Sequence, residues 1–168
     1  TDEGKSNTKD KKKAVPSSGT GFLIDNQGHI ITNFHVVKGC NNQSKIIYQT
    51  KEIDAKLIAK DTFLDLALLK AEINNNQFIS LSNKPPRKLQ RIIAAGYPFG
   101  KYLSDDMKFT SGIVSSLKGL GNDSTRLQID AALNPGNSGG PIVDEETGNL
   151  VAVAVSGLNK DLIDNQAV

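Results

Sequence analysis

The distribution of apolar residues after Gly19 is the feature that most restricts the fold. From Gly19 to Val155 the chain consists of short apolar or alternating runs, and Gly, Asn and Asp separate these runs. Runs of this length and spacing are typical of β-strands rather than of α-helices. The sequence therefore predicts an all-β domain built from many short strands.

The expected strands fall into two groups. Residues 22–24 and 30–32 flank the turn-rich tetrad 25–28, a pattern typical of a β-hairpin. A polar connection at residues 74–88, which contains two adjacent prolines, separates the groups. About five or six strands on each side predict two packed antiparallel barrels. The expected strands are residues 22–24, 30–32, 45–48, 53–57 and 66–69, followed by residues 91–96, 109–114, 127–129, 141–143 and 150–155.

Length and composition predict one compact unit with a polar arm. A chain of 168 residues with 38% hydrophobic content can bury one substantial core or two small cores that lean on each other. We expect residues 1–15 to form a flexible Lys-rich arm, because they carry too little apolar surface to offset the entropy of ordering them. The folded domain is expected at residues 16–168, with the first barrel at about 16–84 and the second at about 87–168.

Several classes of site are disfavoured by composition. Cys40 is the single cysteine, so an intramolecular disulfide is excluded, and with two histidines and no thiolate pair we expect no metal and no cofactor. The net charge of +2 does not call for nucleic acid as a partner. No run approaches the roughly 20 apolar residues of a membrane-spanning helix, so stable membrane insertion is not expected.

The segment Gly136–Gly140 fits the pattern G-x-S-x-G around Ser138. Glycines in this pattern permit a sharp turn that exposes a serine hydroxyl and brings backbone N–H groups close to a bound carbonyl. An ordinary loop between two strands fits the same residues when the motif is taken alone.

Chain order narrows the chemistry, because a serine hydroxyl needs an imidazole to accept its proton. The chain contains only His29 and His35, and both precede Ser138. The order serine, acid, histidine of the α/β-hydrolases is therefore excluded. The order histidine, aspartate, serine remains, and two-barrel folds use this order.

His35 is the expected base, because it lies at the end of an apolar strand from which a rigid scaffold could present its ring. His29 lies beside a turn glycine, and we interpret it as a solvated hairpin residue. Asp65 opens an apolar run between base and nucleophile, so it is the expected third member. Asp61 competes for this role, although its neighbours are more polar.

Together these segments resemble a known family. The matching segments are residues 19–22, 32–37, 65–70, 96–100, 110–114 and 134–141. They are similar to the protease domain of the HtrA (DegP-like) serine peptidases, which have a trypsin-like fold. The resemblance implies two packed antiparallel six-stranded barrels, and it leaves open whether the second barrel contains its final strand.

The resemblance also implies roles for individual residues. His35, Asp65 and Ser138 match the catalytic triad, and the backbone N–H groups of Gly136 and Ser138 match the oxyanion hole, with Asn137 between them. The primary specificity pocket is implied at Ala132, six residues before the nucleophile, and a small or medium aliphatic residue would suit it. One wall of that pocket is implied at Val153, Ala154 and Val155, which also fit the pattern of ordinary buried strand residues.

The function implied by the resemblance is a serine endopeptidase that cleaves unfolded or misfolded proteins through an acyl-enzyme, in protein quality control. A periplasmic or otherwise extracytoplasmic location and a homotrimer are implied in the same way, while no PDZ domain is expected within this chain. The alternative function is a protease-like chaperone or binding module whose active site is not assembled.

Overall fold

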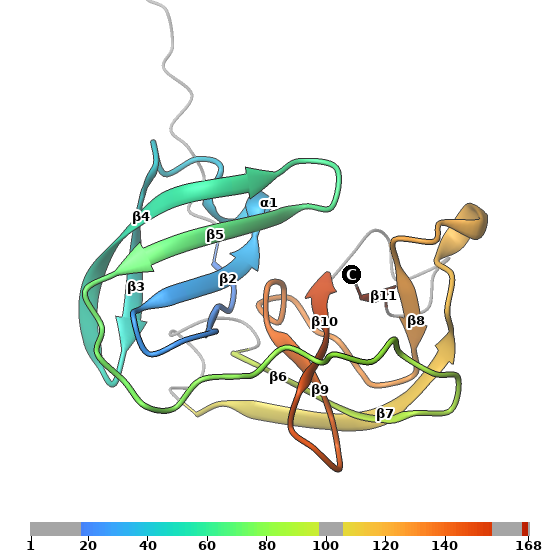
Figure 1. Cartoon of the computed structure of the whole chain (residues 1–168). Helices are drawn as coiled ribbons and strands as arrows, with labels where there is room; N and C mark the ends of the chain where they lie inside the picture. The colour runs from blue at the N-terminus through green and yellow to red at the C-terminus, as the bar shows by residue number, and fades with distance from the viewer. Residues whose placement is uncertain (1–17, 98–105, 156–165, 168) are drawn as a thin grey trace, which may run out of the picture.

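The computed structural model describes residues 18–97 and 106–155 and the backbone of residues 166–167. These residues form two curled antiparallel sheets that lie side by side (Figure 1). The predicted all-β fold of two barrel-like units is confirmed. The arm predicted at residues 1–15 lies outside the described residues.

Among the described residues the first sheet contains five strands, in the order β1-β2-β5-β4-β3. These are the five strands expected from the residue pattern, whereas the resemblance implied six. The two-residue strand β1 and the strand β3 form the edges of this sheet. Strand β4 is long, and its pairing with β5 is interrupted by a bulge between Leu57 and Ala59. The strands are β1 (Phe22–Leu23), β2 (His29–Asn33), β3 (Gln43–Tyr48), β4 (Lys51–Asp61) and β5 (Leu66–Ala71).

Pairing within the first sheet follows the sequence pattern. Phe22 pairs with Ile31 across the turn at residues 25–28, so the predicted hairpin is confirmed. Burial alternates along β5, which places Ala67, Leu69 and Ala71 in the interior. A single-turn helix, α1 (Phe34–Val37), follows β2 directly. No helix among the described residues is long and apolar enough to cross a bilayer.

The second sheet closes on itself in the order β10-β11-β8-β7-β6-β9. Closure depends on the two residues of β11, which pair with β10 on one side and with β8 on the other. A short 3₁₀-helix, η1 (Leu120–Asn122), precedes β8. The strands are β6 (Arg91–Gly96), β7 (Lys108–Ser116), β8 (Leu127–Ile129), β9 (Pro141–Asp144), β10 (Leu150–Val155) and β11 (Gln166–Ala167).

Each sheet encloses its own apolar core, which is why the chain forms two units. In the first unit the buried side chains come mainly from β2, β4 and β5, and in the second they come from β6 to β10. The first core consists of Ile30, Val37, Ala55, Ala67, Leu69, Ala71 and Ile73. The second consists of Ile92, Ala94, Val114, Leu127, Ile129, Ala131, Leu133, Ile142, Ala152 and Ala154.

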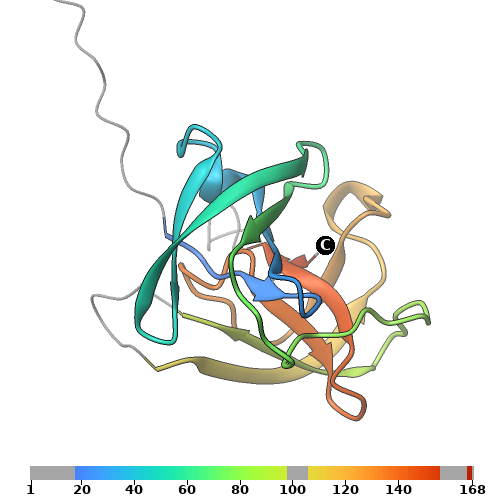
Figure 2. The ribbon, with the colours of Figure 1, turned by 60° about the vertical axis from the view of Figure 1, so that its left-hand side comes forward.

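The connection between the units is bound to both of them. In the first unit, the carbonyl of Leu23 accepts a hydrogen bond from the N–H of Ile79 at 2.9 Å. In the second, Leu150 donates to the carbonyl of Ser80 at 2.8 Å, and Leu81 pairs with Leu150 in a parallel bridge. Figure 2 shows this segment passing along the start of β10. The two units are therefore held in a fixed relation by backbone hydrogen bonds.

Asp144 connects the end of β9 to the start of the second unit. Its carboxylate accepts a hydrogen bond from the side chain of Gln90 at 2.7 Å and another from the N–H of Thr147 at 2.9 Å. These hydrogen bonds, that from Gln90 first, lower the pKa of Asp144. A carboxyl with a lowered pKa contributes stability above its pKa in the unfolded chain, and loses that contribution as the pH falls through its pKa in the folded chain.

We predict that Asp144→Asn lowers the Tm at neutral pH by about 2–4 °C, the shift that ~1 kcal/mol produces in a chain of this size. Below the folded-state pKa of Asp144 the two proteins should unfold at the same temperature, because the native carboxyl is then also neutral. Calorimetry between pH 7 and pH 2 measures the difference. Glu146→Gln serves as the control at an exposed neighbouring position. A Tm difference that is independent of pH would contradict this prediction.

Candidate active site

His35 is presented by the single-turn helix that follows β2. The sequence changes from strand to helix at Asn33, and the N–H of Lys38 closes the turn on the carbonyl of Phe34 at 2.9 Å. The His35 side chain is 39% exposed, so its ring is accessible at the surface of the first unit. We predicted His35 at the end of a strand, and the structure places it two residues after β2, within α1.

Asp65 lies between β4 and β5 and binds His35 through two hydrogen bonds. One carboxylate oxygen, Oδ1, accepts the backbone N–H of His35 at 2.8 Å, and the other, Oδ2, lies 2.6 Å from ring atom Nδ1. An ionised carboxylate can only accept, so Nδ1 carries the proton and Nε2 of the neutral ring has the lone pair. The ring is therefore fixed in the tautomer that a general base on Nε2 requires.

Asp61, the other candidate for the third member of the triad, binds backbone groups of its own turn instead of His35. Its Oδ1 accepts the backbone N–H groups of Phe63 and Leu64, both at 2.9 Å. These two contacts hold the turn between β4 and β5, which is an ordinary role for an aspartate in a loop. The structure thus brings Asp65 to His35 and leaves Asp61 in the turn.

Residues 134–140, which carry Ser138 and are called the serine loop below, begin with a β-turn over residues 134–137. The N–H of Asn137 bonds to the carbonyl of Asn134 at 3.0 Å, and the central residues are Pro135 and Gly136. The φ angle of Gly136 is 97°, a value that the third position of a type II turn requires and that glycine adopts most easily. Ser138 follows this turn and is buried.

The serine loop is docked on the first unit through Thr20. The N–H of Thr20 donates to the carbonyl of Ser138 at 2.8 Å, and its hydroxyl donates to the carbonyl of Gly136 at 2.8 Å. The same hydroxyl accepts the N–H of Tyr97, beyond the end of β6, at 3.0 Å. The sequence analysis missed Thr20, whose position within Gly19–Phe22 was the only signal for it.

Close backbone packing brings the serine loop to the segment that carries His35. A Cβ atom on Gly139 would lie 2.3 Å from both the carbonyl oxygen of Thr20 and the hydroxyl of Thr32, and 2.8 Å from the nitrogen of Asn33. Gly19 lies between Ser138 and helix α1, because a Cβ atom there would meet Ser138 and Val36 within 3 Å. The three predicted triad residues thus come from segments that pack together.

The other residues predicted for substrate binding lie in different environments. Ala132 is exposed, and its carbonyl accepts the hydroxyl of Thr110 at 2.9 Å. Val155 is half-buried, whereas Val153 and Ala154 are buried, the latter in the core of the second unit. The burial of Val153 and Ala154 fits both interpretations of these strand residues, so the pocket wall stays a prediction.

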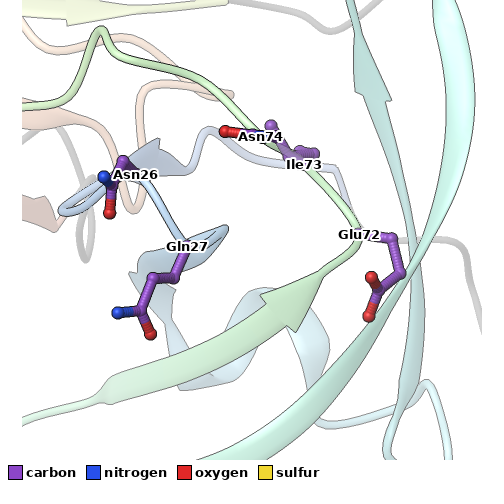
Figure 3. Close-up of a pocket in the computed structure, with 5 residues that line it drawn as sticks. All are labelled: Asn26, Gln27, Glu72, Ile73 and Asn74. Atoms are coloured by element: carbon purple, nitrogen blue, oxygen red, sulfur yellow. The ribbon is translucent and has the colours of Figure 1, made fainter.

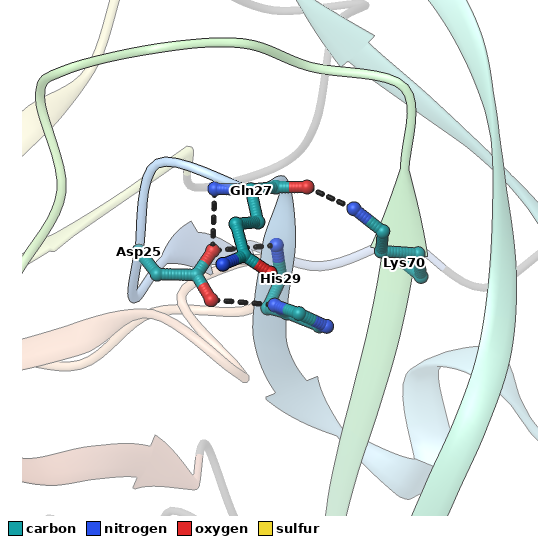
Figure 4. Close-up of polar contacts among 4 residues, drawn as sticks. All are labelled: Asp25, Gln27, His29 and Lys70. Atoms are coloured by element: carbon teal, nitrogen blue, oxygen red, sulfur yellow. Dashed lines mark hydrogen bonds and ion pairs between the residues drawn. The ribbon is translucent and has the colours of Figure 1, made fainter.

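His29 lies in the predicted hairpin with its side chain 26% exposed, but it is paired with a carboxylate rather than surrounded by solvent. Its Nδ1 lies 2.5 Å from the carboxylate of Asp25, and this carboxylate also accepts the N–H groups of Gln27 and His29 (Figure 4). Burial alone would raise the pKa of Asp25, but the hydrogen bonds from His29 and Gln27 lower it. The ammonium of Lys70 donates to the carbonyl of Gln27, which completes this structural cluster.

A polar cavity of about 500 Å³ adjoins this cluster rather than the triad. Side chains from the β1–β2 turn and from the segment after β5 border it (Figure 3). This turn precedes β2 and His35 follows it, so the strand, about 13 Å long at ~3.3 Å per residue, separates the two regions. Among the described residues no three His, Cys, Asp or Glu side chains are grouped to hold a metal ion.

Comparisons with known proteins identify relatives of this arrangement. Residues 19–153 match the family described as "Trypsin-like peptidase domain". The chain is 40% identical over 149 residues to uncharacterized protein y4bJ of Sinorhizobium fredii, which covers 89% of this chain and 23% of that protein. It is 37% identical over 147 residues to a probable periplasmic serine endoprotease, DegP-like, of Pseudomonas fulva, which covers 85% of this chain and 30% of the relative.

The solved structures agree with the fold. The serine endoprotease from Yersinia pestis superimposes with a TM-score of 0.76 at 29% identity, over 92% of this chain and 54% of that one. The chain spans less than a third of the length of the two curated relatives described above. The predicted resemblance and the chymotrypsin- and trypsin-like fold class are confirmed.

The docking of the serine loop generates a prediction about two glycines. Gly139 and Gly148 both have positive φ angles, 82° and 71°, but a Cβ atom on Gly148 would meet nothing within 4 Å. We predict that Gly148→Ala costs about 1–2 kcal/mol from backbone strain alone. Gly139→Ala should cost a further ~1–3 kcal/mol, because its Cβ overlaps backbone atoms of the first unit.

Urea unfolding of the two variants measures the difference between these free energies. Because the strain at φ is common to both, the excess at Gly139 reports the docking contact. Equal losses of stability would show that the serine loop is not packed against Thr20 and Thr32.

Proposed function

The chain belongs to the trypsin-like peptidase family, and from this premise we propose that it is a serine endopeptidase whose triad is His35, Asp65 and Ser138. The observation that carries the proposal is the double contact of the Asp65 carboxylate with the backbone and the ring of His35. Asp25 makes the same double contact with His29, but that pair lies at the other end of β2. His35 and Asp65 instead lie where the serine loop packs against the first unit, and there the double contact provides the fixed tautomer that a general base needs.

In the proposed reaction, Nε2 of His35 accepts the proton of the Ser138 hydroxyl while Oγ attacks the carbonyl carbon of the scissile peptide. The negative charge that develops on the carbonyl oxygen is met by the backbone N–H groups of Gly136 and Ser138, with Asn137 between them. Donors of this kind contribute about 10²–10³-fold in rate.

Collapse of the tetrahedral species breaks the carbon–nitrogen bond, and the imidazolium of His35 gives its proton to the leaving amine. An acyl-enzyme on Ser138 remains. A water molecule that loses its proton to Nε2 then releases the acid product. Asp65 stays ionised throughout and stabilises the imidazolium.

For substrates, we propose extended segments of unfolded or misfolded proteins, cleaved after small or medium aliphatic residues. The exposed Ala132 supports this preference, because it offers no carboxylate that would bind a lysine or an arginine. The names of the DegP-like relatives support a role in protein quality control outside the cytoplasm. A homotrimer is proposed from the family resemblance alone.

We predict that a phosphonofluoridate adds its mass once to the native chain and not to Ser138→Ala. His35→Ala should prevent labelling, and Asp65→Asn should slow it by about 10³–10⁴-fold, since the ring then loses its tautomer. Mass spectrometry over time gives these rates. Asp61→Asn is the matched control for the carboxylate four residues away, and it should react at the native rate.

The alternative of a binding module is tested by the same measurement. If the native chain takes up no label, even when an unfolded protein is added as an activator, the peptidase proposal fails. Labelling of Ser138→Ala would show that another residue is the nucleophile.

A further inference from the structure

We propose that Asn33 is a positioning residue for the triad, because its carboxamide fixes the backbone of Asp65 and thereby aims the carboxylate at His35. This inference rests on the proposed function. The side-chain hydrogen bond of Asn33 goes to Asp65 and not to the ring of His35, so the proposed effect on the ring is transmitted through Asp65.

The side chain of Asn33 is used in an unusual way. It is completely buried at the N-cap position of α1, where asparagine is favoured because its oxygen can accept an N–H of the first helical turn. No such capping bond forms. Instead Nδ2 donates to the backbone carbonyl of Asp65 at 3.0 Å, across 32 residues of sequence.

Stability does not explain this arrangement. The Asn33 oxygen Oδ1 is buried and has no hydrogen-bond partner, which costs folding free energy. The carbonyl of Asp65 already accepts the N–H of Phe34 at 2.9 Å, so it would not be left unpaired without Asn33. An apolar side chain would therefore suit the fold at least as well at this position.

The backbone of Asp65 explains what the contact achieves. Its φ angle is 59°, in the left-handed region that residues other than glycine seldom adopt. Two donors hold its carbonyl, from Asn33 and Phe34, and two more groups, both from His35, hold its carboxylate. With the carbonyl fixed from one side and the carboxylate from the other, this conformation directs Oδ2 to the ring.

The chain contains an internal reference for this pair. His29 contacts Asp25 through the same two atoms, Nδ1 and Oδ2, but all contacts of that carboxylate come from within its own turn. His29 is the first residue of β2 and Asn33 is the last, so the two residues lie at opposite ends of this strand. Because the chain has only two histidines, the imidazole spectrum contains one signal set that should respond to Asn33 and one that should not.

The experiment replaces Asn33 by leucine and, in case the larger side chain does not fit, by alanine. Nitrogen-15 spectra of the two imidazoles report the Nδ1–H tautomer of each, while peptide hydrolysis gives kcat and KM. Ser44→Ala, at another buried polar side chain on β3, is the control.

We expect both Asn33 variants to lose the uniform Nδ1–H tautomer of His35 and to keep that of His29. The kcat value should fall by about 10- to 100-fold with KM nearly unchanged, because a small misplacement of a catalytic group acts on the chemical step. Asn33→Leu should unfold at or above the native urea midpoint. Ser44→Ala should leave both histidine signals and kcat unchanged.

Native His35 signals and native kcat in both Asn33 variants would overturn the proposal. So would a loss of the His29 signal together with that of His35, because it would show a general structural role. A native chain that hydrolyses no peptide and takes up no label would refute the proposed peptidase activity instead. The tautomer comparison would still decide the role of Asn33 in that case.

Discussion

The docking of the serine loop on the first unit is the contact on which the site depends. The loop belongs to the second barrel, yet its backbone is bound by Thr20, and Gly139 fits against Thr32 and Asn33 without room for a side chain. Two separate cores fold on either side of this contact. The proposed nucleophile and the proposed base therefore come from different barrels, and the contact between their segments is made by backbone groups and by the hydroxyl of the buried Thr20.

The proposed acid, Asp65, and the proposed base, His35, in contrast, both belong to the first unit. Residues 33–35 and Asp65 exchange four hydrogen bonds, which hold Asp65 in a left-handed conformation that would otherwise be unfavourable. Strain and a buried unpaired oxygen at Asn33 are both located here, next to the ring whose tautomer matters. Both features lower the stability of the folded chain, and both lie at the point where the proposed chemistry requires a fixed orientation of the ring.

Patterns that act along the chain could be predicted, and contacts between distant segments could not. Alternation and turn residues identified the strands, and the order of His35, Asp65 and Ser138 selected the two-barrel fold. The pairing of His29 could not be predicted, because its partner is a turn aspartate whose orientation the sequence does not reveal. The side chains of Thr20 and Asn33 donate hydrogen bonds to backbone carbonyls more than 30 residues away, and no local pattern predicts such partners.

The central claim is that the two units together assemble one catalytic centre, and a crystal structure of the phosphonylated chain tests it most directly. We expect phosphorus bonded to Oγ of Ser138, with Nε2 of His35 within hydrogen-bond reach of the adduct. The phosphoryl oxygen should lie about 2.7–3.1 Å from the backbone nitrogens of Gly136 and Ser138. An adduct whose phosphoryl oxygen faces solvent, with the His35 ring turned away from it, would contradict the account.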